Sequence, residues 1–403
     1  MRLGCIADDY TGATDLAGLL VRSGARVQLH FGLPDATQQS TAEIEIIALK
    51  CRSIAAQDAV HDCLEAGRWL LAQGADTLYW KYCSTFDSTA NGNIGPVAEA
   101  LMQLTGQQQA LYCPAFPENG RAVFMGHLFV GEQLLSESSL KDHPLNPMTD
   151  ANLCRVLAPQ VTQSVGLWSR IAQQAGTPMP DDTHVIADAV EFADLEFLIQ
   201  HTNPSVLLTG GSALAMPLPA HLGLAQSSPA PWPKTAQSSL VLSGSCSEMT
   251  RQQVAAWVDS RPAFQLDPLD PECAAHALAW WRHQSPDMPC LIYATDTPEA
   301  VRASQANLGV QEAGHRIEEA MGQIAKAALA SGVRRFVLAG GETSGAVTQA
   351  LGITQVRVGP EICPGVPWIF AGTADDPMAL ALKSGNFGTP SFFDDALNSL
   401  DAL

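Results

Sequence analysis

The chain has 403 residues, of which 46% are hydrophobic, and it carries a formal net charge of −19. This length allows two domains, and the composition is that of a folded globular protein rather than a disordered one. The acidic charge argues against nucleic acid or an anionic membrane as a partner, and no apolar run is long enough to span a bilayer.

Ten cysteines are scattered along the chain without any C-x-x-C pair. This distribution predicts reduced thiols rather than disulfides or structural zinc, and therefore a protein of the cytoplasm. The chain passes directly from Met1 into a strand-like run, so we expect no signal peptide. A homodimer is the expectation from the frequency of such assemblies alone.

The most informative motif is IADDYTGATD at residues 6–15, which lies between a strand-like run at Leu3–Ala7 and a helical pattern at Ala13–Val21. Asp8 and Asp9 therefore fall at the carboxyl end of a predicted strand. That edge is where ligands bind in open α/β sheets.

Thr11 and Asp15 add two more polar groups, four residues apart, which would share one helix face. One carboxylate or hydroxyl is enough to cap a helix, so the surplus indicates chemistry. The simpler alternative is that Asp9 or Thr11 caps the helix and the other aspartate is solvated.

Short apolar runs alternate with helix-like stretches through the rest of the first half. We predict strands at Leu3–Ala7, Val27–Phe31, Ile44–Leu49, Thr77–Trp80, Ala110–Cys113, Val185–Ala187 and Val206–Leu208. We predict helices at Ala56–Ala72, Pro96–Leu104 and Val190–Gln200. The alternation predicts an α/β fold with a mostly parallel sheet and helices on both faces.

Two cations are predicted at the same sheet edge as the aspartates, because Arg52 and Lys81 each follow a strand. The segment after Lys81 is dense in hydroxyl and amide groups, and Asp87, Ser88 and Thr89 lie in it. A polyhydroxylated acid needs a cation for its carboxylate and hydrogen-bond partners for its hydroxyls. The alternative is that Arg52 and Lys81 are solvent-facing strand ends.

Residues 225–237 are rich in Pro, Ser and Ala and break the periodicity, so we predict a linker there between domains at 1–224 and 238–403. After it, we predict strands at Leu240–Leu242, Leu291–Tyr293, Phe336–Ala339, Val356–Val358 and Trp368–Ala371. We predict helices at Glu248–Val258, Ala274–Trp281, Gln311–Ala330 and Ala346–Leu351.

Two small-residue turns in this second half link a strand to a helix. LSGSCSE (242–248) contains Ser243 and Ser245, with Ser245 and Glu248 at the spacing of a capping box. LAGGETSG (338–345) is stronger evidence for an anion-binding turn, because successive backbone amides in such a turn form an anion nest. The residues of this turn are Gly340, Gly341, Glu342, Thr343 and Ser344. A third element, LKSGNFG (382–388), follows a helix-like stretch and places Gly385 as its predicted C-cap.

From spacing alone this is a phosphate-binding α/β domain, because the common nucleotide signatures are missing. The motifs together, however, resemble the four-carbon acid sugar kinase family. The matching strings run through nearly the whole chain: IADDYTGATDLA, ALKCRSI, KYCSTFDSTANGNIGPV, PAFPENGR, HPLNPMTD, VLSGSCS, AGGETSGAV, GPEICPGVPW and LALKSGNFG. KYCSTFDST and HPLNPMTD are similar to the 3-oxo-tetronate branch rather than to the D-threonate or erythronate branches.

The resemblance implies an N-terminal acid-sugar-binding domain, a C-terminal ATP-binding domain and phosphate transfer to the 4-hydroxyl of the substrate, with Mg²⁺ carried by the nucleotide. It implies that Asp8, Arg52 and the Lys81–Thr89 segment face the acid sugar. It also implies that Ser243 or Ser245, the Gly340–Ser344 turn and Gly385 contact ATP. The catalytic base is not settled by it, and our hypothesis is Asp8 or Asp9.

Other functions stay open at this point. One is a kinase of the same family that acts on D-threonate or erythronate. Another is a phosphatase or aldolase-like enzyme that uses the same anion-binding loops without ATP. A two-lobed binding protein of the periplasm is disfavoured by the unpaired cysteines and the expected lack of a signal peptide.

Overall fold

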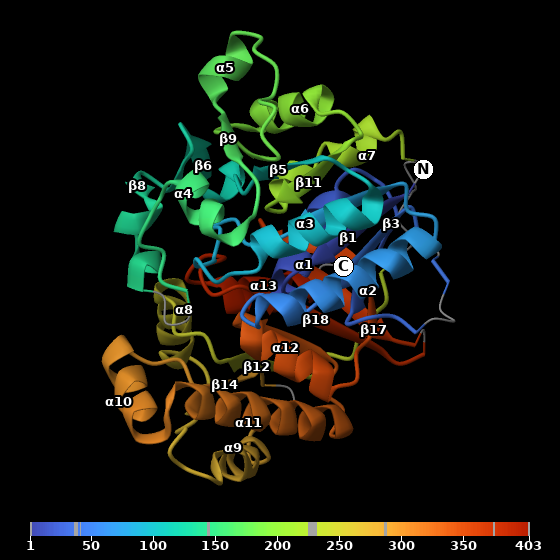
Figure 1. The fold of residues 1–403 in the computed structure, drawn as a ribbon. Helices are drawn as coiled ribbons and strands as arrows, with labels where there is room; N and C mark the ends of the chain where they lie inside the picture. The colour runs from blue at the N-terminus through green and yellow to red at the C-terminus, as the bar shows by residue number, and fades with distance from the viewer. Residues whose placement is uncertain are drawn as a thin grey trace. The chain divides into compact units, whose positions relative to one another are not determined.

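The computed structural model describes residues 2–35, 39–40, 42–142, 146–224, 232–285, 288–373 and 375–401. The chain forms two compact units, residues 1–229 and 230–403, and each is described by itself (Figure 1). No helix in the described ranges is long and apolar enough to cross a membrane. Residues 225–231 of the predicted linker lie outside the described residues, so the linker stays a prediction.

The first unit is built on a parallel sheet with the strand order β2-β3-β1-β4-β11-β5-β10-β9. These strands are β1 (Leu3–Ala7), β2 (Val27–Phe31), β3 (Ile44–Ala48), β4 (Thr77–Lys81), β5 (Gln109–Cys113), β9 (Val165–Trp168), β10 (His184–Ala187) and β11 (Val206–Gly210). A small antiparallel sheet adds β6 (Arg121–Phe124), β7 (His127–Val130) and β8 (Gln133–Leu134), none of which was predicted.

The helices of this unit are α1 (Tyr10–Val21), α2 (Ala56–Ala72), α3 (Ile94–Thr105), α4 (Leu153–Leu157), α5 (Arg170–Gln174), α6 (Phe192–His201) and α7 (Leu218–His221). The crossovers from β1 to β2 and from β3 to β4 run in opposite directions along the sheet. Because such crossovers are right-handed, α1 and α2 cover opposite faces. This is why the strand residues are buried on both sides.

The second unit has the strand order β13-β14-β12-β15-β18-β17-β16. Its strands are β12 (Ser239–Ser243), β13 (Ala263–Gln265), β14 (Cys290–Tyr293), β15 (Arg335–Ala339), β16 (Gln355–Cys363), β17 (Val366–Gly372) and β18 (Pro377–Lys383). The run from β13 to β18 is parallel; β17 is antiparallel to β18, and β16 is antiparallel to β17 and therefore runs in the same direction as the parallel strands.

The helices of the second unit are α8 (Glu248–Val258), α9 (Cys273–Trp281), α10 (Pro298–Leu308), α11 (Val310–Ala330), α12 (Gly341–Ala350) and α13 (Phe392–Asp401). Trp257 of α8 and Phe392 and Phe393 of α13 pack on a core of buried strand residues from the sheet. Helix α11 packs against α9, α10 and α12, and Figure 1 shows α11 and α12 side by side.

The predicted α/β fold with two mostly parallel sheets is confirmed. One local expectation is wrong, because the stretch before LKSGNFG is strand β18 and not a helix. Gly385 is therefore no helix C-cap, and it lies on the connection from β18 to α13. Strand β18 lies between β15 and β17, and its alternate apolar residues Met378, Leu380 and Leu382 are buried there.

Candidate functional site

Three neighbouring strands of the first unit end together at one edge of the sheet. Ala7 at the end of β1 lies opposite Ala48 of β3 and Lys81 of β4. Asp8 and the turn that carries Arg52 follow directly from these strand ends. The crossovers that leave β1 and β3 run in opposite directions along the sheet, and such a switch point is where open α/β sheets bind ligands.

Arg52 joins the two aspartates of the first motif. Its Nε and Nη2 donate to the two carboxylate oxygens of Asp8 at 2.7 and 2.8 Å, and Nη2 also donates to Asp9 Oδ1 at 2.6 Å. Its Nη1 has no hydrogen-bond partner in the part of the chain that the structure describes, and its side chain is 20% exposed. Arg52 is therefore not a solvent-facing strand end, and it keeps one free edge.

Asp9 is the N-cap of α1. Its Oδ1 accepts from the Gly12 backbone N–H at 3.0 Å and its Oδ2 accepts from the Thr11 hydroxyl at 2.7 Å. The simpler alternative was right that Asp9 caps the helix. It was wrong about the other aspartate, because Asp8 is 3% exposed and bonded to Arg52.

The pKa values of Asp8 and Asp9 are shifted in opposite directions. Burial raises the pKa of Asp8 above its ordinary value, because the opposing effects of Arg52 and Lys81 do not fully offset the desolvation. Burial acts on Asp9 in the same direction, but Arg52, Lys81 and the hydrogen bonds from Thr11 and Gly12 outweigh it and lower its pKa. Asp8 is thus the more basic carboxylate of the pair.

Lys81 is buried beside this pair, with 3% of its surface exposed. Its Nζ has no hydrogen-bond partner among the residues described. It lies against Gly12, where any Cβ would clash with both Lys81 Nζ and Asp9 Oδ1. A buried ammonium that keeps its donors is costly without an anion, so this position suits a carboxylate ligand.

Asp15 lies deeper along α1, and its Oδ2 accepts from the Ser212 hydroxyl at 2.6 Å. The carboxylate acts on Arg121, whose pKa is lowered by burial and partly restored by Cys83 and Asp15. The charge of Cys83 also raises the pKa of Arg52. The structure therefore brings Arg121 and Arg52 to the same group of residues.

The segment after Lys81 is held in an unusual backbone conformation. Phe86 is fully buried and has a φ of +52°, in the left-handed region. Asn93 fixes the far end by donating to the carbonyls of Cys51 and Arg52 at 2.7 and 3.3 Å. Asp87 Oδ1 is buried without a hydrogen-bond partner among the described residues. Strain and an unsatisfied oxygen in one segment are typical of functional loops.

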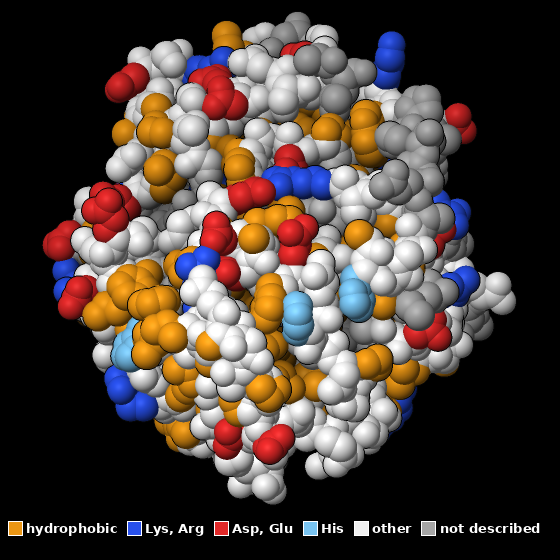
Figure 2. Space-filling model, turned by 90° about the horizontal axis from the view of Figure 1, so that it is seen from above, with side chains coloured by type: hydrophobic (Ala, Val, Ile, Leu, Met, Phe, Trp, Pro, Cys, Tyr) orange, Lys and Arg blue, Asp and Glu red, His pale blue; other side chains and the backbone are white. Residues whose placement is uncertain are grey.

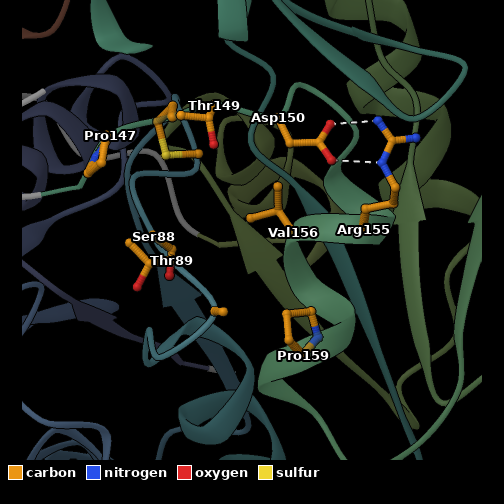
Figure 3. Close-up of a pocket in the computed structure, with 10 residues that line it drawn as sticks. Ser88, Thr89, Pro147, Thr149, Asp150, Arg155, Val156 and Pro159 are labelled. Atoms are coloured by element: carbon orange, nitrogen blue, oxygen red, sulfur yellow. Dashed lines mark hydrogen bonds and ion pairs between the residues drawn. The ribbon is translucent and has the colours of Figure 1, made fainter. Parts of the chain in front are cut away.

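Ser88 and Thr89 line a pocket of about 320 Å³, whose other walls come from residues 147–150 and from α4 and the turn after it (Figure 3). Arg155 makes a bidentate pair with Asp150 at its rim, with distances of 2.6 and 2.7 Å. Asp8, Arg52 and Lys81 do not line this pocket. Residues 143–145, in the HPLNPMTD string, lie outside the described residues.

Three neighbouring strands also end together in the second unit. Ser243 of β12 lies opposite Ala339 of β15, which lies opposite Lys383 of β18. The turns that follow are Gly244–Ser245, Gly340 and Ser384–Gly385, so the three predicted small-residue elements meet at one edge.

These turns are in close contact. A Cβ at Gly244 would clash with Thr343 Oγ1, and one at Gly385 would come within 2.7 Å of Ser245 Oγ. Gly340 has a φ of +121°, and a Cβ there would lie 3.2 Å from the Ser245 backbone nitrogen. Ser243 is fully buried and its hydroxyl bonds to Thr295 at 2.8 Å, so it supports the turn from below.

Helix α12 begins at Gly341, earlier than predicted, so the Gly340–Ser344 turn is the first turn of a helix. Gly341 and Glu342 are exposed, whereas Thr343 and Ser344 are buried. Ser344 Oγ has no partner in the described ranges. Free amides at a helix N-terminus attract anions, so this end of α12 is suited to phosphate.

Several residues that support the two sites were not among the predicted site residues. The cap of α8 is Ser247, whose hydroxyl accepts from the Thr250 N–H at 3.3 Å, and not Ser245. Gln160 donates to Ser88 Oγ at 3.0 Å and to the Thr89 carbonyl at 2.8 Å. Lys383 is fully buried behind Gly385. A serine directly before a helix, as at Ser247, is a common N-cap signal, whereas the role of Gln160 leaves no signal in the sequence.

No group of three or more His, Cys, Asp or Glu side chains in the described ranges is placed to hold a metal ion. On the face drawn in Figure 2, the described Lys and Arg side chains are scattered among acidic and apolar ones and form no large basic patch. This distribution fits the net charge of −19.

Comparisons with known families match the two units separately. A model described as a sugar-binding N-terminal domain matches residues 3–218, and one described as a nucleotide-binding C-terminal domain matches residues 240–393. The first contains Asp8, Arg52 and Lys81, and the second contains the turns at Gly244 and Gly340.

Curated relatives match over nearly the whole chain. The 3-oxo-tetronate kinases of Burkholderia multivorans and Pseudomonas fluorescens are 48% and 49% identical, covering 99% of this chain and 97% of each relative. Among solved structures, one from Salmonella typhimurium LT2 has a TM-score of 0.82 at 40% identity and covers 98% of both chains. Haemophilus influenzae protein HI1011 has a TM-score of 0.73 at 38% identity, covering 98% of this chain and all of its own.

Proposed function

The chain belongs to the four-carbon acid sugar kinase family, and from this premise we propose that it is a 3-oxo-tetronate kinase that transfers the γ-phosphate of ATP to the 4-hydroxyl of its substrate. The observation that carries the proposal is the full-length match to curated 3-oxo-tetronate kinases at 41–49% identity. The prediction of a kinase, made from the sequence motifs, is thereby confirmed.

In the proposed mechanism, the first unit binds the acid sugar. Lys81 Nζ and the free Nη1 of Arg52 supply donors for its carboxylate, and their charges suit a small anion in an otherwise acidic protein. Thr11, Asp15 and the Asp87–Thr89 segment supply partners for its hydroxyl and keto groups.

Asp8 is the proposed base for the 4-hydroxyl. Its pKa is the higher of the two neighbouring carboxylates, and each of its oxygens keeps acceptor capacity beyond the Arg52 bonds. Asp9 is committed to the helix cap, to Thr11 and to Arg52, so we assign it the role of holding Arg52 and the start of α1 in place.

The second unit is proposed to bind ATP. The N-terminus of α12 and the turns at Ser245 and Gly385 offer N–H and hydroxyl donors to its phosphates, and the glycines allow close approach. Mg²⁺ enters with the nucleotide and neutralises phosphate charge. Such an ion keeps several waters and needs few protein ligands, which fits the Thr343 and Ser245 hydroxyls near the turn.

The test is ADP release from MgATP by the purified protein with each of several four-carbon acids: both 3-oxo-tetronates, D-threonate, both erythronates and a buffer blank. Turnover with a 3-oxo acid alone is the expected result. Turnover only with a plain tetronate would move the specificity within the family. ADP at the level of the blank with every acid would overturn the proposal in favour of a phosphatase or aldolase-like enzyme.

The same preparation tests two further parts of the proposal. Omitting Mg²⁺ should abolish turnover, because the phosphate charge then lacks its counter-ion. Sedimentation analysis should give twice the chain mass if the protein is a homodimer. A cytoplasmic location remains a prediction from the cysteine content.

A further inference from the structure

Lys383 is the most deeply buried lysine of the described chain, and the mechanism above does not use it. It ends β18, is fully buried, and its Nζ donates to the carbonyls of Ser384 and Gly385 at 3.0 and 2.7 Å and to Thr250 Oγ1 at 3.0 Å. All three ammonium hydrogens are thus used on protein groups. Lys383 therefore differs from a lysine that binds phosphate directly.

The acceptors of Lys383 belong to two elements that must stay together. Ser384 and Gly385 form the turn after β18, and Thr250 lies in the first turn of α8. Thr250 Oγ1 also contacts the Gly385 carbonyl at 2.8 Å and Ser245 Oγ at 3.2 Å. Lys383 thus connects, through one hydroxyl, to a side chain proposed to contact ATP.

We propose that Lys383 is a positioning residue of the nucleotide site, which holds the Ser384–Gly385 turn against the start of α8 and takes up a proton when ATP binds. This inference rests on the ATP site proposed above. It assigns to Lys383 no contact with the nucleotide.

The hydrogen bonds explain why the proton matters. An ammonium donates to Thr250, and the Thr250 hydroxyl is then free to donate to Gly385 or Ser245. A neutral amine has only two hydrogens and one lone pair. If its hydrogens stay on the two carbonyls, which can only accept, Thr250 donates to Nζ and gives up its other acceptors. The protonation state of Lys383 therefore sets the direction of the bond next to Ser245.

The surroundings place this change near neutral pH. Burial lowers the pKa of Lys383 to about 7, and the charge of Cys363 is the one opposing influence. Ionisable side chains on the elements around it are Arg335 on β15, Cys363 and Glu361 on β16, Glu342 on α12, and Glu248 and Arg251 on α8. The causes of the lowered pKa are burial and the opposing charge of Cys363, and none of these carboxylates is among them. The phosphates of ATP would be the nearest strong negative charge, and they would favour the ammonium.

The experiment is titration calorimetry of the full-length protein with a non-hydrolysable ATP analogue and Mg²⁺, in two buffers of different ionisation heat, between pH 6 and 8. The wild type should take up part of a proton above pH 7, and Lys383→Met should lose this uptake. The KM for ATP of Lys383→Met should rise about tenfold, while the KM for the acid sugar stays within about twofold.

Thr250→Val gives a second variant that leaves the lysine in place. It should weaken ATP binding and alter the uptake, whereas Thr250→Ser should restore both, because serine keeps the hydroxyl. Lys326→Met, an exposed lysine on α11, is the matched control and should behave as the wild type.

Two outcomes would overturn the inference. In one, the wild type is active, and Lys383→Met folds, binds the analogue normally and keeps the proton uptake. The proposed kinase function would then stand without the inference about Lys383. The other is a wild type that does not bind the analogue, which would overturn the inference and the proposed function together. If Lys383→Met does not fold, Thr250→Val with unchanged affinity and uptake would also overturn it.

Discussion

Both candidate sites stand where three neighbouring parallel strands end, yet the two units place different chemistry at that edge. In the first unit the edge carries charged groups, the Asp8–Arg52 ion pair and the ammonium of Lys81 beside Gly12. In the second it carries glycines and hydroxyls around Gly340 and Ser245, and its buried lysine turns toward protein carbonyls.

The difference follows from what each site has to recognise. A four-carbon acid offers one carboxylate and a few hydroxyls, so the protein must supply fixed countercharges to hold and orient it. A nucleotide offers several phosphate oxygens, which backbone N–H groups at a helix start bind well once the chain can approach closely. The comparison predicts that charge changes at the edge of the first unit affect the acid sugar, and that size changes in the glycine turns of the second unit affect ATP.

The largest effect is expected from Asp8→Asn. Loss of the base should lower kcat by roughly 10²- to 10⁴-fold, with a smaller change in the KM for the acid sugar, because Arg52 still bonds to Asp9. Steady-state kinetics with MgATP measure this, and a thermal unfolding scan checks the fold. Asp58→Asn, at an exposed position of α2, is the control. A near wild-type kcat in Asp8→Asn would remove Asp8 from the mechanism.

The next effect is expected from Lys81→Met. Methionine has a similar length but no charge, so the substrate carboxylate loses a charge-assisted bond worth roughly 1.5–3 kcal/mol. The KM for the acid sugar should rise about 10- to 100-fold, and the KM for ATP should not change. An effect on ATP as large as that on the sugar would contradict the division between the two units.

Gly244→Ala tests the second unit by size alone. Its new methyl group would clash with Thr343 Oγ1 and push the turns at Gly244 and Gly340 apart. Overpacking of this kind costs roughly 1–3 kcal/mol, so the KM for ATP should rise about tenfold. Gly314→Ala on α11, where a Cβ meets nothing closer than 4.0 Å, is the matched control. Equal effects of the two variants would argue against a tight nucleotide turn.

The smallest effect is expected from Gln160→Ala. This change removes the two bonds that hold Ser88 and the Thr89 carbonyl beside the pocket of Figure 3. Neutral hydrogen bonds contribute roughly 1 kcal/mol each, and because these two bonds act on the pocket wall, only about half of that free energy should reach the KM for the acid sugar, a rise of about threefold to tenfold. No change in this KM would place the pocket outside the sugar site and leave the Asp8 group as the whole of it.

Much of the fold was predictable because the local pattern of apolar and polar residues marks many of its strands and helices. The strands at Leu3–Ala7 and Val27–Phe31 and the helices at Ala56–Ala72 and Glu248–Val258 have the bounds predicted for them. Each is a clear apolar period between polar or small residues. Strand β18 was mistaken for a helix because its alanines suit both structures, and its position between β15 and β17 decides the matter.

The gathering of site residues was predictable for the same reason that the strands were. Parallel strands bring their carboxyl ends together, so Asp8, Arg52 and Lys81 had to lie at one edge. What the sequence did not contain was the pairing within that edge. Arg52 is bonded to Asp8, while Lys81 keeps its donors. This choice depends on the distances between three loops and on which side chain lies near enough to Asp8 to bond to it.

Gly12 has a consequence for how the gene tolerates change. Every residue other than glycine would place a Cβ against Lys81 Nζ and Asp9 Oδ1 at once. Every missense mutation at this codon therefore displaces Lys81 Nζ and the Asp9 carboxylate, two groups of the candidate sugar site, whatever the chemistry of the new side chain. In a library of variants under selection for growth on the acid sugar, codon 12 should carry synonymous changes only.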